Sequence, residues 1–135
     1  MELPRLLVVD DDAFVCELVR RALRDRYVVV VDTAASQALE RLCDGQRFAA
    51  ILCDVMMPGA SGLDLLAHVR RDFPEQAVSF TLLTAAPTEE LVESGVPFLA
   101  KPFRRDDLVR FVDAHAITLT SDGGRTARRD HETAR

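Results

Sequence analysis

The segment Leu6-Leu7-Val8-Val9-Asp10-Asp11-Asp12 places an apolar run directly before a group of carboxylates. An uninterrupted apolar run is typical of a strand that is buried on both faces of a parallel sheet. Apolar residues then recur at the spacing of an amphipathic helix, at Val15, Leu18, Val19, Ala22 and Leu23. The segment therefore predicts a buried strand, an acidic turn and a helix that packs back onto the sheet.

The same succession of apolar run and helical pattern occurs four more times. The runs are residues 28–31, 50–53, 80–83 and 98–100, and the helical patterns are residues 35–43, 65–73, 88–93 and a last one that begins near Asp106. Five such rounds predict an α/β fold with a doubly wound, five-stranded parallel sheet. Thr88 as N-cap and Gly95 as terminator predict a shortened fourth helix.

Composition limits the classes of function. The chain has 135 residues, which suffice for one domain with an ordinary core, and 17 basic against 22 acidic residues give a formal charge of -5. Direct binding of nucleic acid calls for a concentrated basic face, so we expect no such partner. No apolar stretch is long enough to span a bilayer, and no apolar leader is present. We therefore expect a soluble, cytoplasmic protein that does not bind membranes.

The cysteines and the C-terminal residues predict no further site. Cys16, Cys43 and Cys53 form no CxxC pair, so we expect three small buried side chains rather than disulfides or a zinc site. From Thr118 the periodicity is lost, and residues 120–135 are of mixed charge and contain no apolar residue larger than Ala. We therefore expect a domain at residues 1–117 and a disordered tail at residues 118–135.

Polar residues stand at the ends of four of the five predicted strands. The acidic triplet that begins at Asp10 follows the first run, Asp54 the third, Thr84 the fourth and Lys101 the fifth. Each alone has a plain structural explanation, such as a solvated turn or a favourable charge at a helix N-terminus. The carboxyl ends of parallel strands, however, lie along one edge of the sheet. We therefore expect carboxylates, a hydroxyl and an ammonium in one cleft.

Clustered carboxylates repel one another unless a cation lies between them. Oxygen ligands without His or Cys suit Mg²⁺, or Mn²⁺ in its place, and a phosphoryl group is a common further ligand of such an ion. A carboxylate beside the ion can attack phosphorus and become an aspartyl phosphate. Lys101 and the Thr84 hydroxyl would then bind phosphoryl oxygens.

Four groups of residues together resemble the receiver domain of two-component response regulators. They are residues 6–12, residues 51–59 with Gly62, residues 82–85 and residues 101–103, and the resemblance extends from Leu3 to Ala116. It implies a flavodoxin-like, CheY-like fold and a role in phosphorelay signal transduction. It implies a regulatory domain rather than an enzyme, one that catalyses only its own aspartyl phosphorylation and dephosphorylation.

The resemblance also implies a role for each acidic residue. Asp54 corresponds to the phosphoacceptor, which takes a phosphoryl group from the phosphohistidine of a sensor histidine kinase or a histidine phosphotransfer protein. Asp10 and Asp11 correspond to the acidic pair that binds Mg²⁺ together with Asp54. The backbone carbonyl of Met56 corresponds to a further ligand of the ion.

Three residues correspond to the switch and the phosphate-binding group of the family. Thr84 and Phe98 correspond to the hydroxyl and the aromatic side chain that move on phosphorylation, and Lys101 to the phosphate-binding lysine, which commonly precedes a cis proline. The switch would control the binding of a downstream protein that the sequence does not identify. Only sixteen residues separate Thr84 from Lys101, fewer than is usual in the family. We therefore expect a monomer or an unusual dimer.

Two other classes of function have to be weighed. The pattern Asp10-x-Asp12 is similar to the nucleophile motif of haloacid-dehalogenase-type phosphatases, but Phe14 does not fit that motif and Asp54 would have no role. A receiver-like module that only docks to a partner, without phosphorylation, would not need all five site positions to be filled. The phosphoacceptor hypothesis uses every one of them.

Overall fold

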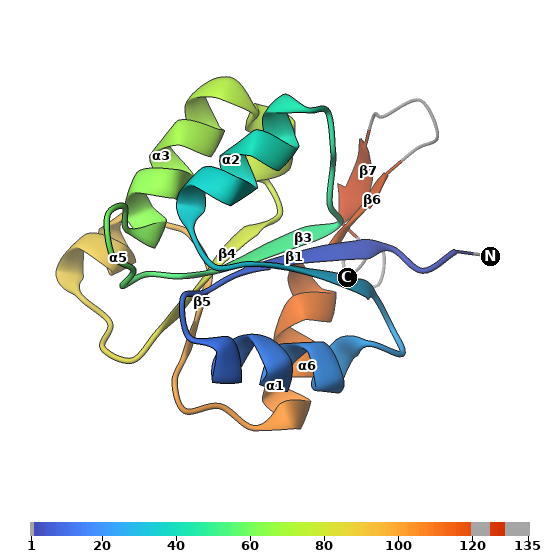
Figure 1. Ribbon diagram of the computed structural model, residues 1–135, viewed down its shortest axis with the longest axis horizontal. Coiled ribbons are helices and arrows are strands. Elements are labelled where there is room, and N and C mark those ends of the chain that lie inside the picture. Colours follow the sequence, from blue (N-terminus) through green and yellow to red (C-terminus); the bar gives the residue numbers. More distant parts are fainter. Residues whose placement is uncertain (1, 120–124, 129–135) are drawn as a thin grey trace.

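The computed structural model, which describes residues 2–119 and 125–128, shows a parallel sheet between two layers of helices (Figure 1). The strands are β1 (Arg5–Val9), β2 (Val28–Asp32), β3 (Ala50–Asp54), β4 (Phe80–Thr84) and β5 (Phe98–Ala100). Their order in the sheet is β2-β1-β3-β4-β5, and every neighbouring pair is parallel. The prediction of a doubly wound five-stranded sheet is confirmed. The strand order reverses between β1 and β3, where folds of this type bind their ligands.

The two faces of the sheet are covered by different helices (Figure 1). α1 (Ala13–Leu23) and α6 (Arg105–His115) lie on one face, and α2 (Ala35–Cys43) and α3 (Gly62–Asp72) lie on the other. Alternate residues of β1 enter the two cores: Leu6 and Val8 pack beneath α1 and α6, whereas Leu7 and Val9 pack beneath α2 and α3. This explains why the strand sequence is apolar without alternation.

Side chains of the turns fix where the helices begin. Asp12 caps α1 by accepting a hydrogen bond from the N–H of Phe14 at 2.9 Å. Ser61 and Asp64 form a reciprocal capping box at the start of α3. These caps hold the loops after β1 and β3, which carry the acidic residues.

The shortened fourth helix is confirmed as α5 (Glu89–Glu93). The Thr88 hydroxyl accepts a hydrogen bond from the N–H of Leu91 at 3.1 Å, as an N-cap does. Gly95 follows the helix with a φ of 74°, a conformation that favours glycine. No described helix is long and apolar enough to cross a membrane.

The structure contains three short elements that the sequence pattern did not predict. α4 (Pro74–Ala77) begins directly after α3, with Pro74 in the first turn, where a missing N–H costs nothing. β6 (Ile117–Leu119) begins at the last residue of the predicted domain and pairs antiparallel with β7 (Arg125–Arg128), which lies in the stretch expected to be a disordered tail. Residues 120–124 and 129–135 lie outside the described part of the chain, so the domain boundary at residue 117 stays a prediction.

The expectation that all three cysteines are buried is wrong for Cys43. Cys16 and Cys53 are buried, but Cys43 is exposed. The buried stripe of α2 consists of Ala35, Ala38 and Leu42. Cys43 fits the same helical spacing, but it is the last residue of the helix and lies beyond the part that the core covers.

Replacement of Gln76 by Leu should destabilise the fold by about 3 kcal/mol. The Gln76 amide is buried, accepts from the N–H of Phe48 at 2.9 Å and donates to the Phe48 carbonyl at 2.8 Å. Leu would leave both backbone groups of Phe48 buried without their partner. Urea unfolding measures the loss, with Gln37→Leu as control. Gln37 is exposed, so its replacement should cost less than about 1 kcal/mol, and equal losses for the two variants would refute this explanation.

Candidate functional site

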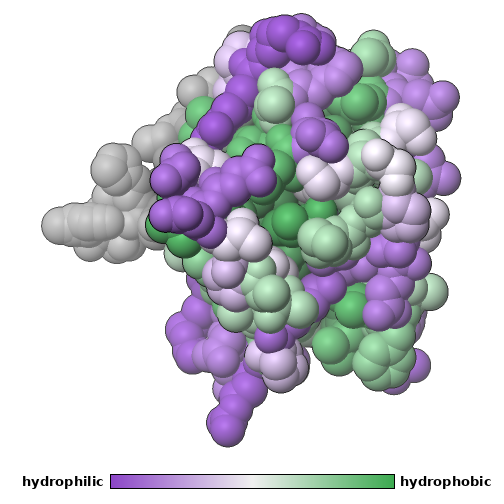
Figure 2. Space-filling model, turned by 90° about the vertical axis from the view of Figure 1, so that its left-hand side faces the viewer, coloured by the Kyte–Doolittle hydropathy of each residue, from purple (hydrophilic) through white to green (hydrophobic). Residues whose placement is uncertain are grey.

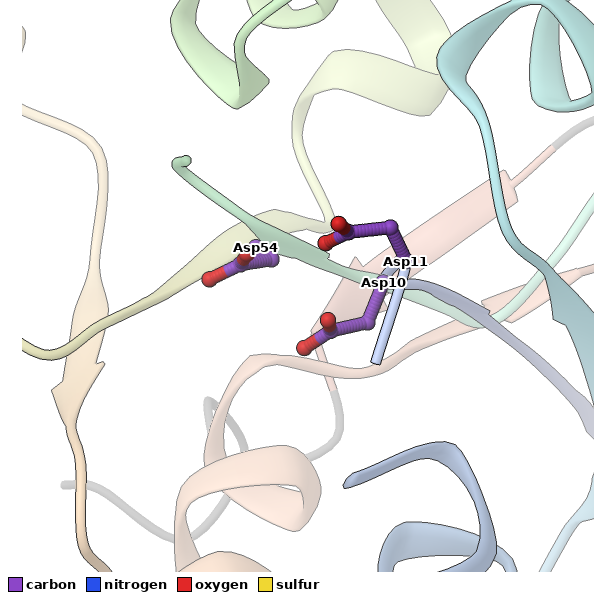
Figure 3. A group of neighbouring side chains, drawn as sticks. All are labelled: Asp10, Asp11 and Asp54. Atoms are coloured by element: carbon purple, nitrogen blue, oxygen red, sulfur yellow. The ribbon is translucent and has the colours of Figure 1, made fainter. Parts of the chain in front are cut away.

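Three carboxylates meet where the strand order reverses. Asp10 and Asp11 follow β1 directly, and Asp54 is the last residue of β3. One carboxylate oxygen from each residue lies within 4.8 Å of those of the other two. All three side chains point to the same side of the sheet edge (Figure 3). The predicted convergence of the acidic residues is thus present in the structure.

Lys101 joins the carboxylates from the far end of the same edge. Its ammonium donates to Asp54 Oδ1 at 3.0 Å and to Asp10 Oδ2 at 3.2 Å. Its backbone N–H donates to the Thr84 carbonyl at 2.7 Å, and the peptide bond to Pro102 is cis. One cation therefore bridges the ends of β1 and β3.

Burial sets the charge balance of the site. Burial is the main cause that raises the pKa of Asp10, and the negative charge of Asp54 adds to it. The N–H of Asp12 and the ammonium of Lys101 oppose only part of this effect. For Lys101, burial alone would lower the pKa, but the hydrogen bond to Asp54 and the charges of Asp10 and Asp54 outweigh it and raise the pKa. Lys101 is therefore firmly protonated.

The predicted switch residues lie on the neighbouring strands. Thr84 ends β4 and is buried, and its hydroxyl accepts from the N–H of Ala86 at 3.1 Å. Phe98 begins β5, is half-buried and packs against the core beneath α2 and α3. Met56 lies in the loop two residues after Asp54. The switch role of Thr84 and Phe98 and the ligand role of the Met56 carbonyl stay predictions.

Gly62 supports the site in a way that the sequence pattern did not reveal. A Cβ atom at this position would lie 2.4 Å from the backbone oxygen of Asp54 and 2.9 Å from a methyl group of Leu82. The Gly62 N–H donates to the Val55 carbonyl at 2.9 Å. The first turn of α3 thus packs directly on the backbone of Asp54, an approach that only glycine permits. In the sequence, the only sign of this role is that Gly62 belongs, with residues 51–59, to the residues that resemble the receiver family.

The face of the molecule at which the strands end combines hydrophobic and hydrophilic areas (Figure 2). Phe14, at the start of α1, is 76% exposed, and Met56 is 75% exposed. Both are close in sequence to the aspartates. A partner that approaches the carboxylates therefore meets apolar side chains as well as charge.

The donor set fits a hard divalent cation. Three carboxylates within reach of one another, without a thiolate or imidazole among them, are ligands that suit Mg²⁺ or Mn²⁺. Asp11 is exposed, whereas Asp10 and Asp54 are buried. The site therefore has an open side, which agrees with an ion that keeps waters or a phosphoryl oxygen as further ligands.

Metal-free protein should lose part of its stability as the pH rises, because of Asp10. A carboxyl group whose pKa is raised by folding binds its proton more tightly in the folded state. Its stabilising contribution is present below the unfolded pKa and is lost as the pH rises through the raised, folded pKa. Asp10→Asn should remove this loss. Urea unfolding of both proteins with chelator, from acid to neutral pH, measures it, and parallel curves would contradict the assignment.

The fold and the site together define a flavodoxin-like α/β domain with an acidic site at its strand-order reversal. Residues 6–113 match the family described as the response regulator receiver domain, and the chain belongs to this family. It is a receiver domain of the two-component response regulators, and its role is regulatory. Receiver domains of this family interact with histidine kinases. The family assignment also makes the phosphatase alternative unnecessary.

Curated relatives agree with this assignment. PetR of Rhodobacter capsulatus is 36% identical over 117 residues, which are 82% of this chain and 48% of that protein. The hydrogenase transcriptional regulatory protein HoxA of Bradyrhizobium diazoefficiens is 35% identical over 112 residues, which are 79% of this chain and 23% of that protein. The chain thus spans at most half the length of these relatives.

Solved structures agree with the fold. The chemotaxis protein CheY4 of Vibrio cholerae is similar with a TM-score of 0.75 and 26% identity, covering 84% of this chain and 98% of that one. The BeF3-activated receiver domain of DrrB is similar with a TM-score of 0.69 and 25% identity, covering 82% of this chain and 98% of that one. The predicted CheY-like fold is therefore confirmed.

Proposed function

We propose that Asp54 accepts a phosphoryl group from the phosphohistidine of a histidine kinase or a histidine phosphotransfer protein, in a Mg²⁺-dependent reaction. The resulting aspartyl phosphate changes the binding of a downstream protein. The observation that carries this proposal is the position of Lys101, whose ammonium contacts both Asp54 and Asp10 beside a cluster of three carboxylates. A lysine and an acidic cluster together can bind both a metal ion and a phosphoryl group.

The chemistry transfers phosphorus from nitrogen to oxygen. A carboxylate oxygen of Asp54 forms the new bond to phosphorus while the bond from phosphorus to the donor histidine breaks. Asp10, Asp11, Asp54 and the Met56 carbonyl would hold Mg²⁺, or Mn²⁺ in its place, which supplies positive charge against the phosphoryl oxygens. The Lys101 ammonium, which contacts Asp54 Oδ1 before the transfer, supplies further positive charge beside the acceptor.

The proposed switch consists of Thr84, at the end of β4, and Phe98, on β5. The Thr84 hydroxyl accepts a hydrogen bond from the N–H of Ala86, and it gives up this hydrogen bond when it turns toward the phosphoryl group. Phe98 on β5 pairs with Leu82 on β4, and Leu82 is two residues before Thr84. The Phe98 side chain fills the space that the movement of Thr84 opens. Movement of these two residues would carry the signal to the surface around α5.

Phosphorylation should require the divalent ion. Incubation with a small acyl-phosphate donor and Mg²⁺ should add one phosphoryl group to the intact mass, and the same incubation with chelator should add none, because the carboxylates then repel the donor. Restoring Mg²⁺ should restore the gain. Steady turnover of the donor without a labelled protein would instead show a phosphatase, and no gain under any condition would show a docking module.

The short α5 bears on whether the protein forms dimers. Its five residues provide little helical surface for contact with a second chain, so we propose a monomer or an unusual dimer. Light scattering of the phosphorylated protein should give the mass of one chain at micromolar concentration. A phosphorylation-dependent dimer whose interface lies away from α5, β5 and α6 would support the unusual dimer. A dimer through the surface of α5, β5 and α6 would contradict the proposal.

The proposed partners are proteins. The acidic charge of -5 supports the absence of direct nucleic-acid contact and leaves the output to a protein partner. Several relatives are named as transcriptional regulatory proteins, and this chain spans only part of their length. Any contact with DNA is therefore assigned to residues outside this chain.

A further inference from the structure

Asp10 is held at each of its polar atoms by a different part of the chain. Its N–H donates to the carbonyl of Asp32 at the end of β2 at 3.1 Å. Oδ1 accepts from the N–H of Asp12 at 2.9 Å, and Oδ2 accepts from Lys101. The backbone oxygen accepts from the thiol of Cys16 at 3.2 Å. Because Asp10 is fully buried, these bonds replace those that water would make.

The Cys16 thiol forms an unusual bond for a helical side chain. Short polar side chains in a helix usually bond to the carbonyl three or four residues earlier, which here belongs to Ala13 or Asp12. The thiol instead bonds to Asp10, six residues earlier and outside the helix. It therefore ties the second turn of α1 to the residue that carries a carboxylate of the acidic cluster.

The thiol keeps its proton in this environment. Cys16 is 4% exposed, and its sulfur lies 3.2 Å from the carbonyl oxygen of Asp10. An ordinary cysteine thiol carries its proton at neutral pH, so this buried thiol donates to the carbonyl. A thiol is a weak donor, so its contribution is smaller than that of a hydroxyl or an amide.

We propose that Cys16 is a positioning residue for the metal-binding carboxylate of Asp10. Its hydrogen bond fixes the Asp10 carbonyl, and with it the backbone from which the carboxylate projects toward Asp11 and Asp54. The inference rests on the proposed function, because it concerns the binding of Mg²⁺. Residues that orient metal ligands commonly change metal affinity strongly when they are replaced, and for a weak donor we expect about a fivefold effect.

The test compares four variants by calorimetric titration of the metal-free protein with Mg²⁺. Cys16→Ala and Cys16→Val both remove the donor, and Val also fills the space of the sulfur, so both should raise the Kd for Mg²⁺ about fivefold. Cys16→Ser keeps a donor and should stay within about twofold. Val19→Ala is the control, because Val19 packs in the same core on the same helix. It should lower the melting temperature without changing the Kd.

A spectroscopic measurement separates positioning from loosening of the fold. The ¹³C chemical shift of the Asp10 carbonyl should change in Cys16→Ala and Cys16→Val but return toward the wild-type value in Cys16→Ser. If the wild type binds Mg²⁺ and the two donor-free variants bind it equally well, the positioning role is wrong while the proposed function stands. If the wild type binds no Mg²⁺, the metal part of the proposed function fails and the positioning role fails with it. If Val19→Ala weakens binding as much as Cys16→Ala, the effect is only structural and the inference is overturned.

Discussion

Asp54→Asn should abolish covalent phosphorylation completely. An amide cannot become an acyl phosphate. The other two carboxylates of the cluster, those of Asp10 and Asp11, follow β1 rather than β3, so we expect neither to replace Asp54 as the acceptor. Intact mass after incubation with an acyl-phosphate donor and Mg²⁺ should therefore show one added phosphoryl group in the wild type and none in the variant. The variant should remain folded, because Asn keeps the shape of the side chain and removes one of three mutually repelling charges.

Asp44→Asn provides the matched control for this experiment. Asp44 is exposed at the C-terminal end of α2, outside the acidic cluster, and its replacement makes the same change of charge. It should be phosphorylated like the wild type. A phosphoryl group that persists in Asp54→Asn, or one that is lost equally in both variants, would contradict the role of Asp54.

Gly62→Ala should be the most damaging of the small substitutions, with a loss of about 3 kcal/mol or more in unfolding free energy. The added methyl group would lie 2.4 Å from the Asp54 backbone oxygen, and the Cα of Val55 is 3.0 Å away. Backbone atoms at the end of a buried strand cannot move aside as a flexible side chain can. The expected response is a shift of α3 away from β3, which also displaces Asp54 and slows its phosphorylation.

Gly45→Ala separates the steric effect from the loss of a glycine. Gly45 has a φ of 94°, and nothing lies within 4 Å of a Cβ at that position. Its replacement should cost about 1 kcal/mol through backbone strain alone. Urea unfolding of both variants, with phosphorylation rates of the folded proteins, measures the difference. Equal losses, or a normal phosphorylation rate in Gly62→Ala, would show that the close approach does not support the site.

The fold and the convergence of the site residues could be predicted because they follow from pattern. Continuous apolar runs require a sheet covered on both faces, and a parallel sheet brings the residues after each strand to one edge. Asp10, Asp54 and Lys101 could therefore be placed together from their positions at strand ends alone. The cap at Thr88 and the end at Gly95 are equally local and were predicted for the same reason.

Other features depend on contacts that a linear pattern does not contain. The exclusion of a side chain at Gly62 results from the packing of α3 on β3. The hydrogen bond from Cys16 to Asp10 crosses from α1 to the turn that follows β1. The four residues of α4 are too few to show a helical period, and the buried amide of Gln76 replaces the apolar residue that a pattern would require. Exposure of Cys43 was missed because the position fits the apolar spacing of α2.

Chemical localisation shows which residue carries the phosphoryl group. Borohydride reduces an acyl phosphate to an alcohol, so a phosphorylated aspartate becomes homoserine, which peptide mass spectrometry locates in the chain. We expect homoserine in place of Asp54 alone, and only after treatment with both the phosphoryl donor and Mg²⁺. Homoserine in place of Asp10 or Asp12, or an unmodified Asp54 in protein that has gained the phosphoryl mass, would contradict this expectation.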